Sequence, residues 1–179
     1  MPEGSGEKWD EHSLGQVEGI MDHSLGQVIG IVVSYNSTFI HTLRFLCVKD
    51  NIRQISEQHG CSGGNSEMIA LDYPTEFLTA VHGYRDGSAN LYSSGSSITI
   101  KSITFVTNKA TYGPFGQQLK GNCGTPFGFK ISGNDSRNWI SGFYGTVYRG
   151  YLECLGVYVH TPTTSQPDES IRQCKSEIQ

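Results

Sequence analysis

Short runs in which hydrophobic and polar residues alternate recur along most of the chain. Residues 98–107 alternate most regularly, and a period of two places successive side chains on opposite faces of a β-strand. Turn-forming residues separate the runs, and no segment shows the 3.6-residue period of an amphipathic helix. The pattern therefore predicts an all-β domain, either a sandwich, a barrel or a prism. The other predicted strands lie within residues 31–35, 39–45, 68–83, 125–129, 139–145 and 151–159.

Composition narrows the class of protein further. A chain of 179 residues is long enough for one domain with a sizeable core. Its net charge of −4 argues against nucleic-acid binding, which needs a basic face. It has no run of 18 apolar residues, so we expect no membrane insertion. The first residues lack the apolar core of a signal peptide, which predicts a cytoplasmic protein.

The five cysteines are scattered, and none of them stands in a CxxC motif. An odd number without metal-ligand spacing is typical of reduced thiols in an intracellular protein. We therefore expect neither a disulfide framework nor a metal site. The cysteines are Cys47, Cys61, Cys123, Cys154 and Cys174.

Residues 11–32 contain a duplication. The segments 11–21 and 22–32 are identical at eight of eleven positions. The second copy runs directly into the strand at 31–35, so we expect it to be the copy that belongs to the fold. At the other end, residues 161–179 are polar and predicted to be a disordered tail, which leaves 1–160 as the domain.

Several motifs, in order along the chain, closely resemble the jacalin-related lectins: residues 71–83, 105–116, 124–127 and 142–158. The resemblance implies a β-prism I of three four-stranded Greek-key sheets with sugar contacts at one end. It further implies a plant lectin of the mannose/glucose type that binds glycans, needs no cofactor and forms a homo-oligomer. Within these motifs Gly113-Pro114 and Gly124-Thr125-Pro126 predict turns that keep proline out of central strands. Tyr112, Phe115, Phe127 and Phe143 are interpreted as packing residues.

Lectins of this family use a glycine loop near the N-terminus and a Gly-x-x-x-Asp loop before the last strand. Only one glycine carries over to the first loop, and the second loop departs twice, with Arg149 for glycine and Glu153 for aspartate. Glutamate keeps the carboxylate but moves its oxygens by about 1.5 Å. The loop is also one residue longer than usual. The predicted sugar-binding residues are Gly6, Arg149, Gly150, Tyr151, Leu152 and Glu153.

The altered loop leaves several interpretations open. Arg149 either pairs with Glu153 and closes the pocket or itself donates to a sugar hydroxyl. In another registration Gly150 takes the place of the family's glycine. A third possibility is that the loop is solvated and holds no ligand. Residues 84–90 stand where a further family loop tunes specificity, although that assignment rests on position alone.

An enzymatic function finds little support in the sequence. Asp72 and Glu76 could form a paired-carboxylate site, but they lie inside a strand-and-turn motif, which favours a structural role. No nucleophile elbow or phosphate-binding loop is present. Two hypotheses remain: a glycan-binding lectin, and a β-prism that has lost sugar binding and serves as an interaction module.

Overall fold

The computed structural model describes residues 7–10, 26–86, 99–118, 124–132, 137–148 and 150–161. These residues form strands joined by turns and contain no helix, as the period-two pattern predicts. The strands are β1 (Glu7–Asp10), β2 (Gln27–Tyr35), β3 (Ile40–Lys49), β4 (Ile52–Ile55), β5 (His59–Gly60), β6 (Asn65–Ala70), β7 (Leu78–Arg85), β8 (Ile100–Thr107), β9 (Thr111–Gly116), β10 (Thr125–Lys130), β11 (Trp139–Tyr148) and β12 (Tyr151–His160).

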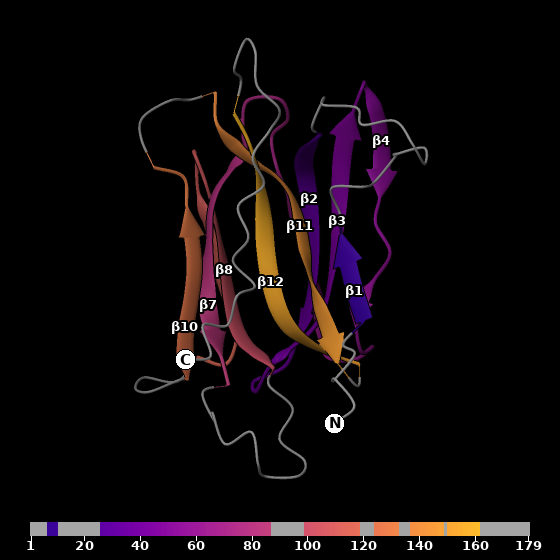
Figure 1. Ribbon diagram of the computed structural model, residues 1–179, viewed down its shortest axis with the longest axis vertical. Helices are drawn as coiled ribbons and strands as arrows, with labels where there is room; N and C mark the ends of the chain where they lie inside the picture. Colours follow the sequence, from indigo (N-terminus) through magenta and orange to yellow (C-terminus); the bar gives the residue numbers. More distant parts are fainter. Residues whose placement is uncertain are drawn as a thin grey trace.

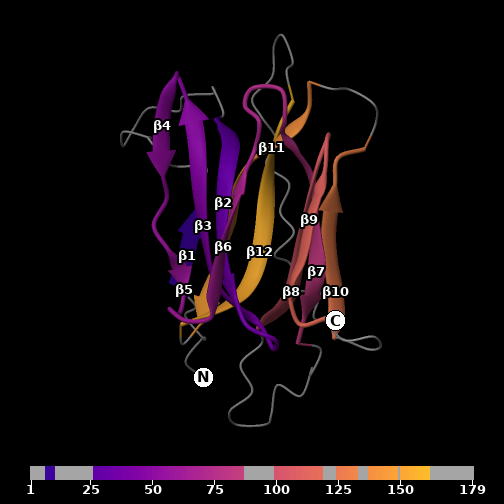
Figure 2. The same ribbon diagram turned by 180° about the vertical axis from the view of Figure 1, so that it is seen from behind.

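The strands form three antiparallel sheets that enclose a common interior, with the strands running along the long axis of the molecule (Figures 1 and 2). The strand orders are β1-β11-β12, β10-β7-β8-β9 and β4-β3-β2-β6, and β5 adds to the last sheet by pairing with β3. This arrangement is the expected β-prism. In the described residues the β1-β11-β12 sheet has three strands and the β10-β7-β8-β9 sheet has four. The third sheet has five strands, because β5 adds to its four.

Three phenylalanines, one from each sheet, meet at the centre of the prism. Phe143 of β11, Phe45 of β3 and Phe105 of β8 are each 0% exposed. The rings of Phe45 and Phe143 stack with centroids 4.4 Å apart, and Phe105 meets Phe143 edge-on at 6.2 Å. Because Phe143 contacts both other rings, it joins the three sheets through the core.

The packing role predicted for the motif aromatics is confirmed. Phe115 and Phe143 belong to the buried core, and Tyr112 and Phe127 pack against it. The predicted turns at Gly113-Pro114 and Gly124-Thr125-Pro126 are wrong in part, because Pro114 and Pro126 lie within β9 and β10. Both strands are at the edges of their sheet, where a residue without an N–H group can avoid interrupting a ladder.

The second copy of the duplication does enter the fold, since residues 27–32 form the first part of β2. The first copy, 11–21, lies outside the described residues, as does the predicted tail from residue 162 onward. The expectation that every cysteine is a reduced thiol is wrong at Cys154, which is disulfide-bonded. Cys47 and Cys61 are free thiols.

Candidate functional site

The predicted sugar-binding turn lies at the end of the prism where β1 begins. In the strand register Val147 of β11 is paired with Glu7 on one side and with Leu152 on the other. Figure 1 shows the start of β1, the end of β11 and the start of β12 at the same, lower end of the molecule. Gly6 and Arg149 lie outside the described residues, but Glu7, which follows Gly6, is in register with Val147, two residues before Arg149.

Glu153 occupies a β-bulge near the start of β12. Thr146 pairs with Cys154 and Val147 pairs with Leu152, so the register skips Glu153, which is the extra residue of the bulge. Such a bulge bends the strand and redirects a side chain. The extra length that the sequence indicates in this hairpin therefore has a structural counterpart, and it falls at the carboxylate itself.

Glu153 lines a pocket of about 250 Å³ between two of the sheets. One wall comes from β12, and the other comes from the end of β7 and the beginnings of β8 and β10. Among the lining residues Glu153 is the one acid and Arg85 the one base. The pocket thus offers a hydrogen-bond acceptor, a cationic donor and an apolar wall. Its lining residues are Arg85, Ile100, Pro126, Phe127, Gly128, Glu153, Cys154 and Leu155.

The other described residues of the predicted site shape the turn. Gly150 has a φ of 83°, in the left-handed region that favours glycine, so it meets the conformational need expected of the family's loop glycine. The ring of Tyr151 packs edge-on against Phe39 with centroids 5.5 Å apart. Leu152 is 0% exposed and its side chain belongs to the core. Tyr151 and Leu152 thus keep their backbone groups as possible contacts.

Sequence reasoning assigned no role to Arg85 beyond its place in the loop at 84–90. The structure brings it to the pocket because β7 ends there, with Arg85 in register with Thr125 of β10 and Ile100 of β8. Phe127 was assigned to packing alone, and it both packs on the core and lines the pocket. The sequence signal that could have indicated a role for Arg85 was its position at the end of a predicted strand, next to turn-forming residues.

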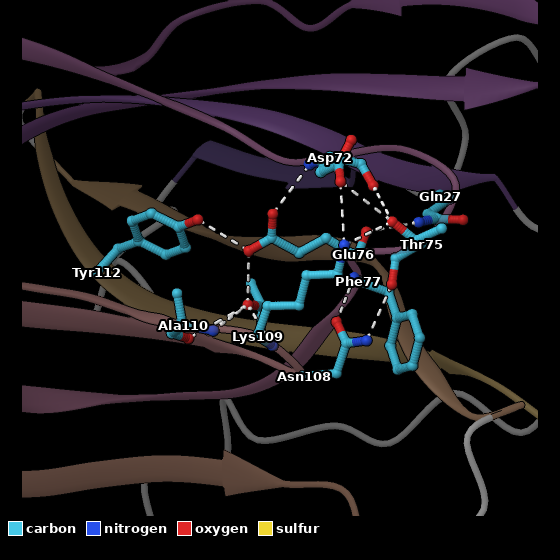
Figure 3. Close-up of polar contacts among 10 residues, drawn as sticks. Gln27, Asp72, Thr75, Glu76, Phe77, Asn108, Lys109, Ala110 and Tyr112 are labelled. Carbon is cyan, nitrogen blue, oxygen red and sulfur yellow. Dashed lines mark hydrogen bonds and ion pairs between the residues drawn. The ribbon is translucent and has the colours of Figure 1, made fainter.

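The carboxylates Asp72 and Glu76 form a network elsewhere in the molecule, and this network has a structural role (Figure 3). Glu76 is 4% exposed and accepts hydrogen bonds from the Asp72 N–H at 2.9 Å, the Thr107 hydroxyl at 2.7 Å and the Tyr112 hydroxyl at 2.8 Å. The Lys109 ammonium lies 3.0 Å from the Asp72 carboxylate. The Glu76 carboxylate is therefore occupied in fastening the turn before β7 to β8 and β9.

This network makes stability depend on pH. Burial raises the pKa of Glu76, but the hydrogen bonds from Asp72, Thr107 and Tyr112 outweigh it and hold the pKa below the usual 4.5. A lowered pKa in the folded state means that the ionised carboxylate stabilises the fold above about pH 4.5. That contribution is lost as the pH falls through the lowered value.

We expect Glu76→Gln to reduce the free energy of unfolding at pH 7 by about 1–3 kcal/mol, because the charge is lost and the amide NH2 that replaces one oxygen can no longer accept a hydrogen bond. Below pH 4 the difference in the free energy of unfolding between the variant and the parent should become smaller. Urea unfolding at pH 7 and pH 3 measures both effects, with the exposed Glu57→Gln as the matched control. Equal stability of Glu76→Gln and the parent at pH 7 would contradict this assignment.

Neither a metal site nor a membrane-spanning helix occurs in the part of the chain that the structure describes. No group of three or more His, Cys, Asp or Glu side chains there is placed to hold a metal ion. None of these residues belongs to a helix long and apolar enough to cross a bilayer.

Comparison with known proteins identifies one family. Residues 3–158 match the model of the Jacalin-like lectin domain. Jacalin-related lectin 19 of Arabidopsis thaliana is 36% identical over 121 residues, which cover 66% of this chain and 60% of that protein. Protein RESTRICTED TEV MOVEMENT 1, also from Arabidopsis thaliana, is 32% identical over 135 residues, which cover 74% of this chain and 71% of that protein.

Solved structures with the same fold hold sugars of two types. The artocarpin–mannopentose complex has a TM-score of 0.66 and 25% identity, covering 87% of this chain and 91% of that chain. A galactose-specific lectin from Artocarpus hirsuta, in complex with methyl-α-D-galactose, has a TM-score of 0.66 and 26% identity, covering 87% and 100%.

Proposed function

The chain belongs to the jacalin-related lectin family, and from that premise we propose that it binds glycans in the pocket lined by Glu153 and Arg85. The observation that carries this proposal is the bulge at Glu153, which places an acid in the pocket between the sheets. Lectins bind sugars without transforming them, so we expect no enzymatic activity.

The groups that line the pocket suit a sugar. A carboxylate accepts hydrogens from two neighbouring hydroxyls, and a guanidinium donates to hydroxyl or ring oxygens. Phe127 and Pro126 supply an apolar wall for the C–H face of the ring. A pocket of about 250 Å³ is slightly smaller than those that hold drug-sized ligands, a size that suits one sugar residue.

We propose a preference for sugars of the mannose/glucose type, in keeping with the likeness to the artocarpin complex. The galactose-specific lectin from Artocarpus hirsuta is equally similar in fold, so a test has to include both classes. Arg149 bears on this preference, because it replaces the loop glycine of the family and directly precedes Gly150 in the sequence.

A glycan array carrying mannose, glucose and galactose structures tests the proposal directly. We expect retention of mannose- or glucose-terminated glycans with millimolar or tighter affinity. Arg149→Gly should bind more strongly than the parent if Arg149 closes the pocket on Glu153, and more weakly if it donates to the sugar. A folded protein that retains nothing on a broad array would contradict the proposal.

The second candidate is an interaction module without sugar binding. It is favoured by the similarity to a relative that is named for restricting TEV movement and not for a sugar. The departures from the family motif at Arg149 and Glu153 support the same candidate. If the array retains no glycan while the circular dichroism spectrum shows a folded protein, this second candidate is favoured.

Location and assembly remain proposals. We retain a cytoplasmic location from the sequence, although the disulfide at Cys154 weighs against it because the cytosol keeps thiols reduced.

A homo-oligomer is proposed from the family resemblance. The surface of the β4-β3-β2-β6 sheet supports it, since Ile52, Ile55 and Met68 are 59%, 56% and 60% exposed there.

A further inference from the structure

Arg85 brings a positive charge into the pocket between the two sheets. Its side chain is half-buried, and no described residue forms a hydrogen bond or ion pair with its guanidinium. The acid next to it in sequence is engaged elsewhere, because Asp86 lies 3.8 Å from the Lys101 ammonium. The guanidinium therefore remains available to a ligand.

An unmatched guanidinium in such a place favours an anion. Arginine stays charged at every physiological pH, and its planar fork of donors fits a carboxylate through two parallel hydrogen bonds. Partial burial removes some of the water that otherwise solvates the charge, so an anionic ligand group restores interactions that the protein does not supply. A neutral hydroxyl restores fewer of them.

Glu153 limits which anion can enter. It lines the same pocket, so a doubly charged phosphate would meet one cation and one anion. A singly charged carboxylate meets less repulsion from Glu153 while it pairs with Arg85, and the ring hydroxyls of the same ligand can donate to Glu153. The pocket of about 250 Å³ suits one sugar ring that carries both kinds of group.

We propose that the pocket selects a hexuronate, a sugar of the mannose/glucose type whose C6 hydroxymethyl group is replaced by a carboxylate. Arg85 binds the carboxylate and Glu153 accepts the ring hydroxyls. The inference rests on the proposed glycan-binding function and adds the class of sugar.

Isothermal titration calorimetry with methyl α-D-glucopyranoside and methyl α-D-glucopyranosiduronate tests it, since the two compounds differ only at C6. We expect the uronate to bind at least about tenfold more tightly than the neutral sugar, because an added charge-assisted bidentate contact is strong. Arg85→Gln should remove this preference, so that the affinities of the two sugars come within about threefold of each other. Arg85→Lys should keep part of the preference, since it keeps the charge but loses the fork.

Arg53 is an exposed residue of β4, and Arg53→Gln is the matched control for general attraction of anions. This variant should keep the preference for the uronate. Equal affinity for the two sugars in the parent, or an equal loss of preference in Arg53→Gln, would overturn the hexuronate assignment and leave glycan binding in place. If neither sugar binds and the array is also silent, glycan binding itself fails, and the hexuronate assignment with it. Circular dichroism of each variant separates loss of binding from loss of the fold.

Discussion

Glu153→Gln is expected to weaken glycan binding about 100-fold or more. The substitution keeps the size of the side chain but removes the charge and turns one acceptor oxygen into an amide donor. Each hydrogen bond to a charged group contributes about 1.5–3 kcal/mol, so the loss of one such bond and of the charge that strengthens the other costs about 3 kcal/mol. Since about 1.4 kcal/mol corresponds to a factor of ten in affinity, calorimetric titration of the sugar retained on the array resolves the effect easily.

The free energy of unfolding should change by less than about 1 kcal/mol in this variant, because the side chain is half-buried in a bulge and not in the core. Glu57→Gln removes an exposed carboxylate away from the pocket and should bind as the parent does. Undiminished binding by Glu153→Gln would show that the sugar lies elsewhere on the molecule.

Phe143→Ala is expected to lower the free energy of unfolding by about 3–5 kcal/mol, the range measured for buried phenylalanines. The ring is 0% exposed and stacks on Phe45 of the second sheet while meeting Phe105 of the third. Its removal leaves a cavity where the three sheets meet. The melting temperature should fall by about 10 °C or more, as measured by calorimetry.

Phe129→Ala is the control of the same chemistry, because Phe129 lies on the edge strand β10 and is only partly buried. Phe129→Ala should lower the free energy of unfolding by less than half as much as Phe143→Ala does. Losses of equal size in the two variants would mean that the central aromatic cluster has no special part in joining the sheets.

The local sequence pattern predicted most of the strands, because side-chain alternation depends on nearest neighbours alone. Residues 98–107, for example, contain β8 (Ile100–Thr107), whose first, third to sixth and eighth residues are buried. The prolines were harder to place. A proline next to a glycine is typical of a turn, but Pro114 and Pro126 sit in edge strands, and only the pairing of strands determines which strand is an edge.

The candidate site was predictable only in part. The hairpin motif pointed to Glu153, and Glu153 lines the pocket. Leu152, three residues after Arg149 in the same motif, turns into the core, and the bulge follows it directly at Glu153. A bulge cannot be located from one strand, since it is defined by the register with its partner.

The sequence by itself determined the all-β class, the resemblance to a lectin family and the presence of a carboxylate near the start of the last strand. Only the tertiary structure decided that Arg85, on a different sheet, lines the same pocket as Glu153 and that the core is joined by one phenylalanine from each sheet. The physical reason is that periodicity fixes which face of a strand is buried. The contacts between sheets depend instead on how three twisted surfaces pack against one another, and no single segment encodes that packing.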